Sequence, residues 1–154
     1  MKVSKNETET YVLTKIDRLD PVTAYVTNYS PERGKIVIEC FCRSWSCYWG
    51  GMGKTNLQEF FLSCDNDYIL NKLLPETQQT DFDEINKLAN KQGFSLCVSS
   101  DVEVAMQSQE MAECFGDDWY MDLPRCPTSD YRYVGRIITA IKEAFQEEMA
   151  VSQP

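Results

Sequence analysis

The 154-residue sequence contains no histidine. Histidine is the usual acid–base group near neutral pH, so its absence excludes Ser-His-Asp triads, Cys-His pairs and histidine metal sites. The chain also has no apolar run of about 18 residues, the length that spans a membrane. Its first residues, MKVSKNETETYVL, lack the apolar core and cleavage site of a secretory signal. We therefore expect a protein of a reducing cytoplasm that contacts no membrane.

Basic residues are scarce, since 15 Lys and Arg stand against 24 Asp and Glu, for a formal charge of −9. Direct nucleic-acid binding needs a basic footprint, so this balance argues against it and permits a partner with a basic surface. The seven cysteines are an odd number in a chain without an export signal. They are best interpreted as free and mostly buried thiols.

The hydrophobic pattern changes from strand-like to helix-like along the chain. Alternation predicts strands at 11–16 and 22–27, then a hairpin with strands at 36–42 and 45–49 joined by a turn at Arg43-Ser44. After Gly53 helical spacing dominates, interrupted by a short strand at 94–98. One helix is predicted from Ser100 to about Phe115, followed by an irregular acidic loop. A long apolar stripe marks the last helix, with Val134, Ile137, Ile138, Ile141, Ala144, Phe145 and Met149.

These elements predict an α+β fold, because strands come first and helices follow. An antiparallel sheet of three to five strands in the N-terminal half would pack against several helices, including the long C-terminal amphipathic helix. The length suits a single domain over 1–154, with a flexible segment at 1–9 and a polar linker at 75–80.

Residues 51–55 read Gly-Met-Gly-Lys-Thr and look like the second half of a phosphate-binding loop. That loop requires G-x-x-x-x-G-K-[ST], so that its backbone N–H groups can surround the phosphates. The first glycine of the pattern is replaced by the bulky Tyr48. We interpret the segment as a glycine turn and predict no cofactor, while Lys54 and Thr55 remain weak candidates for a nucleotide site.

Three cysteines, Cys40, Cys42 and Cys47, fall in the predicted hairpin, and Cys64 or an acidic residue is a conceivable fourth metal ligand. Structural zinc sites usually show C-x(2–4)-C knuckles, whereas Cys-x-Cys on a strand splays its thiols. No histidine is present to activate a cysteine nucleophile. We therefore predict thiols that pack as small hydrophobes, no metal site and no catalytic residue.

Acidic side chains gather in the second half of the chain. Such a run is most often a solvated face; the second interpretation is a partner surface that resembles the phosphate array of DNA, and the third a catalytic or magnesium-binding pair. Trp119 and Tyr120 lie among these acids, where they either anchor a partner or close over the core. The predicted partner-binding residues are Glu110, Glu113, Asp117, Asp118, Trp119, Tyr120 and Asp122.

Several segments resemble small accessory proteins of tailed bacteriophages and prophages. Those proteins pair an LDPV segment with a strand carrying ECYG-SW and a YWGGMG turn. Here the matching residues are Arg18–Val22, Ile38–Cys40, Ser44-Trp45, Tyr48–Gly53 and Glu59–Phe61, with a further match at Arg136–Ile141. The similarity covers about residues 16–74, and Phe41-Cys42 stands where Tyr-Gly is expected.

The resemblance implies a phage protein in the cytoplasm of an infected bacterium. It does not point to any particular reaction. By analogy, small acidic phage proteins often block host machinery, including CRISPR and restriction systems. We therefore expect a non-enzymatic protein that inhibits a host protein, such as a nucleic-acid-binding CRISPR effector, through an acidic surface. Two alternatives are a nucleotide-binding module or enzyme centred on Lys54-Thr55, and a structural or regulatory protein that self-associates through the aromatic hairpin.

Overall fold

The computed structural model describes residues 1–151, which form two compact units. Unit 1 combines Met1–Thr77 with the C-terminal segment from Ser129, and unit 2 is Gln78–Thr128. Each unit contains its own cluster of buried hydrophobic side chains. The sequence predicted a single domain over 1–154. That the two units unfold together, as one domain would, stays a prediction.

Unit 1 is built on a four-stranded antiparallel sheet whose strands follow chain order. The register pairs Ala24 with Ile38 and Val26 with Ile36, so these four side chains point to the same face and are buried there. This confirms the antiparallel sheet predicted in the N-terminal half. The strands are β1 (Glu9–Leu13), β2 (Val22–Ser30), β3 (Arg33–Cys40) and β4 (Arg43–Trp49).

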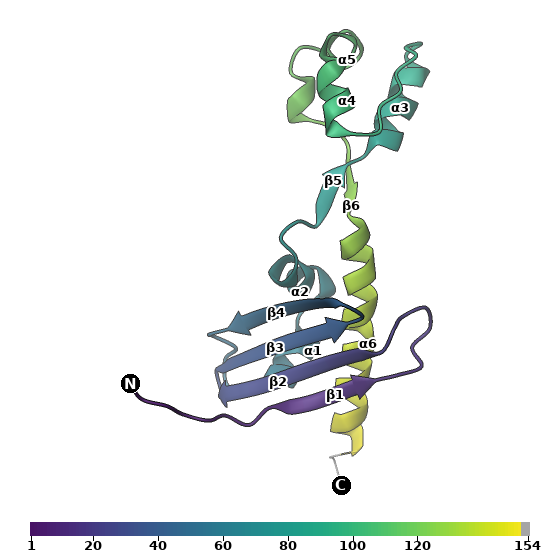
Figure 1. Cartoon of the computed structure of the whole chain (residues 1–154). Helices are drawn as coiled ribbons and strands as arrows, with labels where there is room; N and C mark the ends of the chain where they lie inside the picture. Colours follow the sequence, from purple (N-terminus) through teal and green to yellow (C-terminus); the bar gives the residue numbers. More distant parts are fainter. Residues whose placement is uncertain (152–154) are drawn as a thin grey trace. The chain divides into compact units, whose positions relative to one another are not determined.

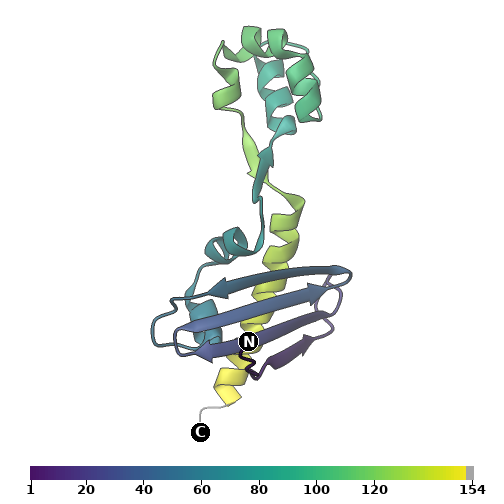
Figure 2. The ribbon, with the colours of Figure 1, turned by 60° about the vertical axis from the view of Figure 1, so that its left-hand side comes forward.

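Three helices cover one face of this sheet: α1 (Leu57–Ser63), α2 (Asn66–Leu73) and α6 (Ser129–Val151) (Figures 1 and 2). The α6 stripe was predicted from its helical spacing, and Val134, Ile137, Ile138, Ile141 and Phe145 are indeed fully buried. The α+β fold is therefore confirmed, with a long helix at its C-terminal end. Within residues 1–151, no helix has both the length and the apolar character needed to cross a bilayer.

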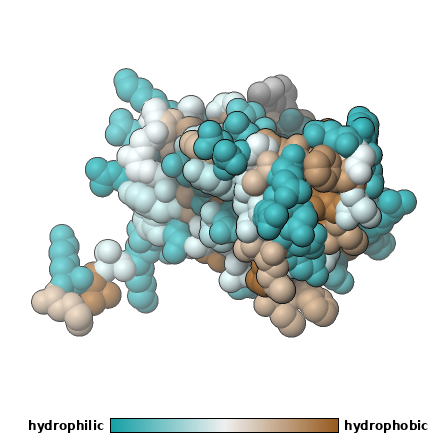
Figure 3. Space-filling model, turned by 90° about the horizontal axis from the view of Figure 1, so that it is seen from above, coloured by the Kyte–Doolittle hydropathy of each residue, from teal (hydrophilic) through white to brown (hydrophobic). Residues whose placement is uncertain are grey.

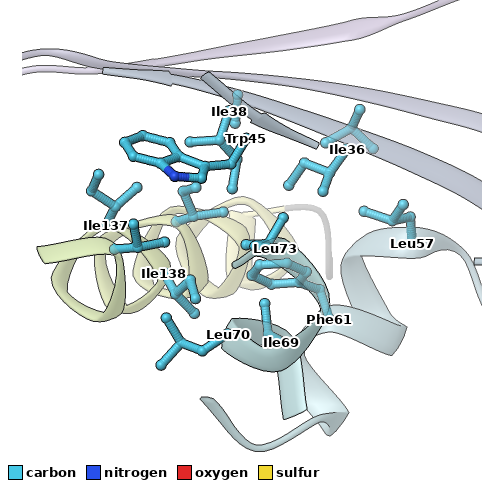
Figure 4. Packing of buried hydrophobic residues seen from close by; sticks show 14 of the residues in the cluster. Ile36, Ile38, Trp45, Leu57, Phe61, Ile69, Leu70, Leu73, Ile137 and Ile138 are labelled. Atoms are coloured by element: carbon cyan, nitrogen blue, oxygen red, sulfur yellow. The ribbon is translucent and has the colours of Figure 1, made fainter. Parts of the chain in front are cut away.

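The core of unit 1 joins all three helices to the sheet. Leu57 of α1 points toward Ile36 of β3, Phe61 of α1 lies beside Ile69 of α2, and Ile138 of α6 lies next to Leu70 of α2 (Figure 4). Aromatic rings extend this core. The ring of Phe145 lies edge-on to Tyr11 at 5.0 Å between centroids and to Phe61 at 5.7 Å.

The turn between β3 and β4 lies two residues earlier than predicted, at Phe41-Cys42, and Arg43 already pairs with Cys40. This register places Trp45 opposite Ile38, so that two large apolar side chains meet on the buried face. The strand predicted over 36–42 therefore ends at Cys40, and Cys42 is exposed in the turn rather than buried. Phe41 occupies the turn with a φ of 55°.

An ion pair joins this hairpin to α6, because Arg43 donates to both carboxylate oxygens of Asp130 at 2.9 and 2.5 Å. The bond from Arg43 lowers the pKa of the Asp130 carboxyl below its ordinary value. A depressed pKa stabilises the fold above the unfolded-state value of about 3.9, and the contribution is lost as pH falls through the folded-state pKa.

We expect a small but measurable coupling free energy between Arg43 and Asp130 at pH 7, because both side chains are partly exposed. A double-mutant cycle with R43Q and D130N, followed by urea unfolding at pH 7 and at the lowest pH where the fold persists, measures it. The coupling should shrink on acidification. Equal coupling at both pH values would show that the pair is not ionic.

Unit 2 consists of short helices and a two-stranded ribbon. Its core contains Ile85, Ala89, Leu96, Val98, Val104, Met111 and Cys114. Side chains cap the helix starts, since the Asp81 side chain accepts from the Glu84 N–H and the Ser100 side chain accepts from the Glu103 N–H. The elements are β5 (Gln78–Thr80), α3 (Phe82–Lys91), α4 (Asp101–Met106), α5 (Ser108–Phe115), the 3-10 helix η1 (Trp119–Met121) and β6 (Arg125–Pro127).

Three predictions for unit 2 are corrected. Residues 94–98 form no strand: Leu96 and Val98 are buried, but the Asn86 side chain rather than a strand bonds the backbone N–H and C=O of Val98, at 2.9 and 2.8 Å. The single helix predicted from Ser100 is interrupted at Gln107. The predicted linker at 75–80 and acidic loop each contribute one strand of the β5–β6 ribbon.

Candidate functional site

Negative charge is concentrated in unit 2. Its 51 residues carry ten acidic and three basic side chains, a formal charge of −7 out of −9 for the whole chain. No Lys or Arg occurs between Lys91 and Arg125. The acidic character that the sequence shows is therefore a property of one compact unit.

Several of these carboxylates have structural partners within unit 2. Asp81 caps α3, Glu84 pairs with Lys87 at 2.8 Å, and Asp101 accepts from the Thr80 hydroxyl at 2.8 Å. Glu103 accepts from both the hydroxyl and the backbone N–H of Ser99, and these bonds lower the pKa of its carboxyl. Such groups stabilise local structure, and their charge is shared with a donor.

A second set of carboxylates has no such compensation. We call it the acidic surface: Glu110, Glu113, Asp117, Asp118 and Asp122. All five side chains are exposed, and no ion pair reaches any of them in residues 1–151. Glu113 accepts a hydrogen bond from the Gln109 side-chain amide at 3.0 Å.

Local geometry holds the acidic surface together. Glu110 and Glu113 are one turn apart on α5, and α5 ends at Gly116, whose φ of 91° is a backbone conformation that side-chain-bearing residues rarely adopt. The Trp119 N–H then bonds to the Gly116 carbonyl at 3.1 Å, which folds η1 back toward the end of α5. The predicted acids are thus brought into one short stretch of α5, turn and η1.

The two aromatic candidates take different positions. Trp119 is partly buried and packs on the core of unit 2, whereas Tyr120 is 62% exposed. Their rings lie edge-on, with centroids 6.0 Å apart. Trp119 thus joins the core, as one of the two sequence interpretations had it, and Tyr120 is accessible beside the acidic surface.

Met121 is exposed beside Tyr120, and sequence reasoning missed two further exposed apolar side chains in the same unit, Val102 and Met106. The sequence placed Val102 and Met106 in a helix without saying which side of that helix is exposed. Their spacing of four residues already puts both on the same side. The face of the molecule in Figure 3 likewise mixes hydrophilic side chains with hydrophobic ones.

Polar groups of Thr55 and of the helix start that follows it already make hydrogen bonds within the chain. The Thr55 hydroxyl donates to the Met52 carbonyl at 2.9 Å. At the start of α1, the N–H of Leu57 bonds to the Asn28 side chain at 2.8 Å and the N–H of Glu59 bonds to the Asn56 side chain at 2.8 Å. Two backbone donors that a phosphate would use are therefore engaged, which argues against the nucleotide alternative.

The cysteines are distributed rather than clustered. Cys40 is buried with its Sγ 3.2 Å from the Tyr133 hydroxyl, Cys42 is exposed, and burial raises the pKa of the Cys47 and Cys64 thiols. A raised pKa disfavours the thiolate that metals and nucleophilic reactions require. Within the described chain, no three Cys, Asp or Glu side chains come together as potential metal ligands.

Unit 1 contains an open groove of about 1000 Å³ between α2, α6 and the loop at 16–19. Three acidic side chains, Asp17, Asp67 and Glu143, and two basic ones, Arg132 and Arg136, line its walls, so both signs of charge are present. Arg136 is already held by the carbonyl of Arg18 at 3.3 Å. The groove therefore gives no comparable indication of the ligand it would accept.

Comparison with known proteins shows the family of the chain. No curated protein and no solved structure matches the chain. The model of Phage_phiTE_072, described as a phage family, matches residues 1–147. This match extends over both units, including the acidic surface that the resemblance at 16–74 did not reach. The chain belongs to this phage family.

Proposed function

We propose that this phage protein acts without catalysis, in the host bacterial cytoplasm, by binding and inhibiting a host protein through the acidic surface. One observation carries the proposal: five exposed carboxylates that form no ion pair with any described residue lie in a unit of charge −7, where no Lys or Arg occurs between Lys91 and Arg125. Keeping like charges this close costs stability, and a complementary basic surface would compensate for that cost.

The proposed partner is a protein that binds nucleic acid. Its phosphate-binding surface is rich in Lys and Arg, and carboxylates on a folded unit can occupy that surface in place of phosphates. In an infected bacterium, host defence complexes of the CRISPR effector type have such surfaces. Occupying the surface would block the complex without any chemical step, which suits a chain that has no histidine.

The test is affinity capture of the tagged protein from an infected host, followed by mass spectrometry. We expect the wild type to retain a nucleic-acid-binding complex at a fixed ratio, and the E113K/D117K/D118K variant to retain at least tenfold less. The matched control is E7K/E32K/E147K, which reverses three exposed carboxylates of unit 1 and so changes the net charge equally. This control should capture the complex like the wild type.

Salt provides a second readout on the captured complex. Binding by ionic contacts weakens as salt increases, and fewer contacts give a shallower dependence. The triple variant should therefore bind more weakly and with less sensitivity to salt than the wild type. Equal capture by the wild type and the E113K/D117K/D118K variant would reject the acidic surface, and capture of no partner would reject the function.

A further inference from the structure

Unit 2 exposes four large hydrophobic side chains beside the acidic surface. They are Val102 (68% exposed), Met106 (79%), Tyr120 (62%) and Met121 (70%), and we call them the apolar anchors. The core of the unit is complete without them, since none belongs to its buried cluster or packs against it. Their exposure therefore does not follow from the way the unit folds.

Helical spacing places two of the anchors on one side of the helix that precedes the acidic surface. Val102 and Met106 are four residues apart on one side of α4, and Glu110 and Glu113 are one turn apart on α5, the next helix along the chain. Val104 of α4 and Met111 of α5 are buried in the core of the unit. The exposed residues are thus apolar on α4 and acidic on α5.

The second pair of anchors lies in η1, between the carboxylates of Asp118 and Asp122. Here too, apolar and acidic side chains alternate within a few residues. Methionine is unbranched and polarizable, so Met106 and Met121 can adapt to apolar side chains of different shapes. Apolar groups that stay exposed beside charge are typical of protein interaction sites.

We infer that the apolar anchors and the acidic surface together take a basic amphipathic segment of the partner, with Lys or Arg against the carboxylates and large apolar side chains against the anchors. The inference rests on the proposed function and adds the local chemistry of the partner. Charge complementarity selects this occupant. A second copy would bring its own five carboxylates to the same face, and an anionic lipid surface would be repelled in the same way.

Synthetic peptides test the inference without the natural partner. One probe is an amphipathic peptide of Lys and Leu, and its control has the same number of Lys with every Leu replaced by Gln. Fluorescence titration of the full chain should show at least tenfold tighter binding of the Lys/Leu peptide. In the V102T/M106Q variant this preference should disappear, while binding of the Lys/Gln peptide stays as in the wild type.

The matched control is V12T/Y48Q, which changes two exposed hydrophobic side chains of unit 1 and should keep the preference. Equal binding of both peptides by the wild type would overturn the anchors, as would failure to bind either. If V102T/M106Q instead abolished a concentration-dependent dimer in light scattering, the occupant would be a second copy and the inference wrong. The proposed function is tested separately: it fails if the wild type captures no nucleic-acid-binding complex, and the acidic surface fails if E113K/D117K/D118K captures as much as the wild type.

Discussion

Replacement of Phe145 by alanine is expected to lower the free energy of unfolding of unit 1 by about 3–5 kcal/mol. The ring is fully buried and lies edge-on to both Tyr11 of β1 and Phe61 of α1. Its removal would leave a cavity where the C-terminal helix meets the first strand and the first helix, segments far apart in sequence. Urea unfolding followed by tryptophan fluorescence measures the loss, because Trp45 and Trp49 lie in the same core.

The matched control is F41A, the same change at a ring that is 78% exposed in the β3–β4 turn. Little apolar area is buried there, so the effect should stay within about 0.5 kcal/mol. Similar losses for F145A and F41A would contradict the packing of α6 against β1 and α1.

The fold was predictable where one face of an element is buried. Alternation along 22–27 and 36–40 identified the sheet strands, and the stripe from Val134 to Phe145 identified the long helix, because each pattern reflects burial against a single core. The β3–β4 turn was misplaced because two registers both bury Trp45. Only the cross-strand pairing with Ile38 distinguishes them.

Unit 2 was harder to predict, for a physical reason. Leu96 and Val98 alternate like a strand, yet the hydrogen bonds of Val98 are made by a side chain, and no local pattern reveals that partner. The chain passes from unit 1 into unit 2 at β5 and returns to unit 1 after β6, and each of these strands has only three residues. Strands this short give no periodic signal, so the division into two units was not visible in the sequence.

The acidic residues of the candidate site could be predicted from the sequence, whereas its exposed apolar residues could not. A carboxylate is recognised wherever it stands, so Glu110 to Asp122 were assigned from the sequence alone. Which of the acids are compensated depends on contacts such as Ser99 with Glu103, which only the structure supplies. Val102 and Met106 required knowledge of the buried side of α4, since hydrophobic residues occur on both sides of it.

The second large effect is expected at Met111, which is fully buried in the core of unit 2. M111A should remove about 2–5 kcal/mol. A core built from 51 residues has little stability to spare, so the loss should unfold unit 2 under conditions where the wild type stays folded. Because unit 1 has its own core, its amides should keep their protection in hydrogen exchange, and the wild-type pattern should persist in α6 and the sheet.

The effect of M111A on partner binding tests whether the acidic surface needs a folded unit 2 in addition to its charges. M111A keeps every residue of the acidic surface, yet it removes the helix that holds Glu110 and Glu113 one turn apart. We therefore expect M111A to lose the captured host complex as completely as E113K/D117K/D118K does, whereas V102A, an exposed control on α4, should keep unit 2 protected from exchange. If M111A instead exposed the amides of both units at once, the chain would unfold as the single domain that its sequence predicted. If M111A unfolded unit 2 and still captured the complex, the binding surface would have to lie on unit 1.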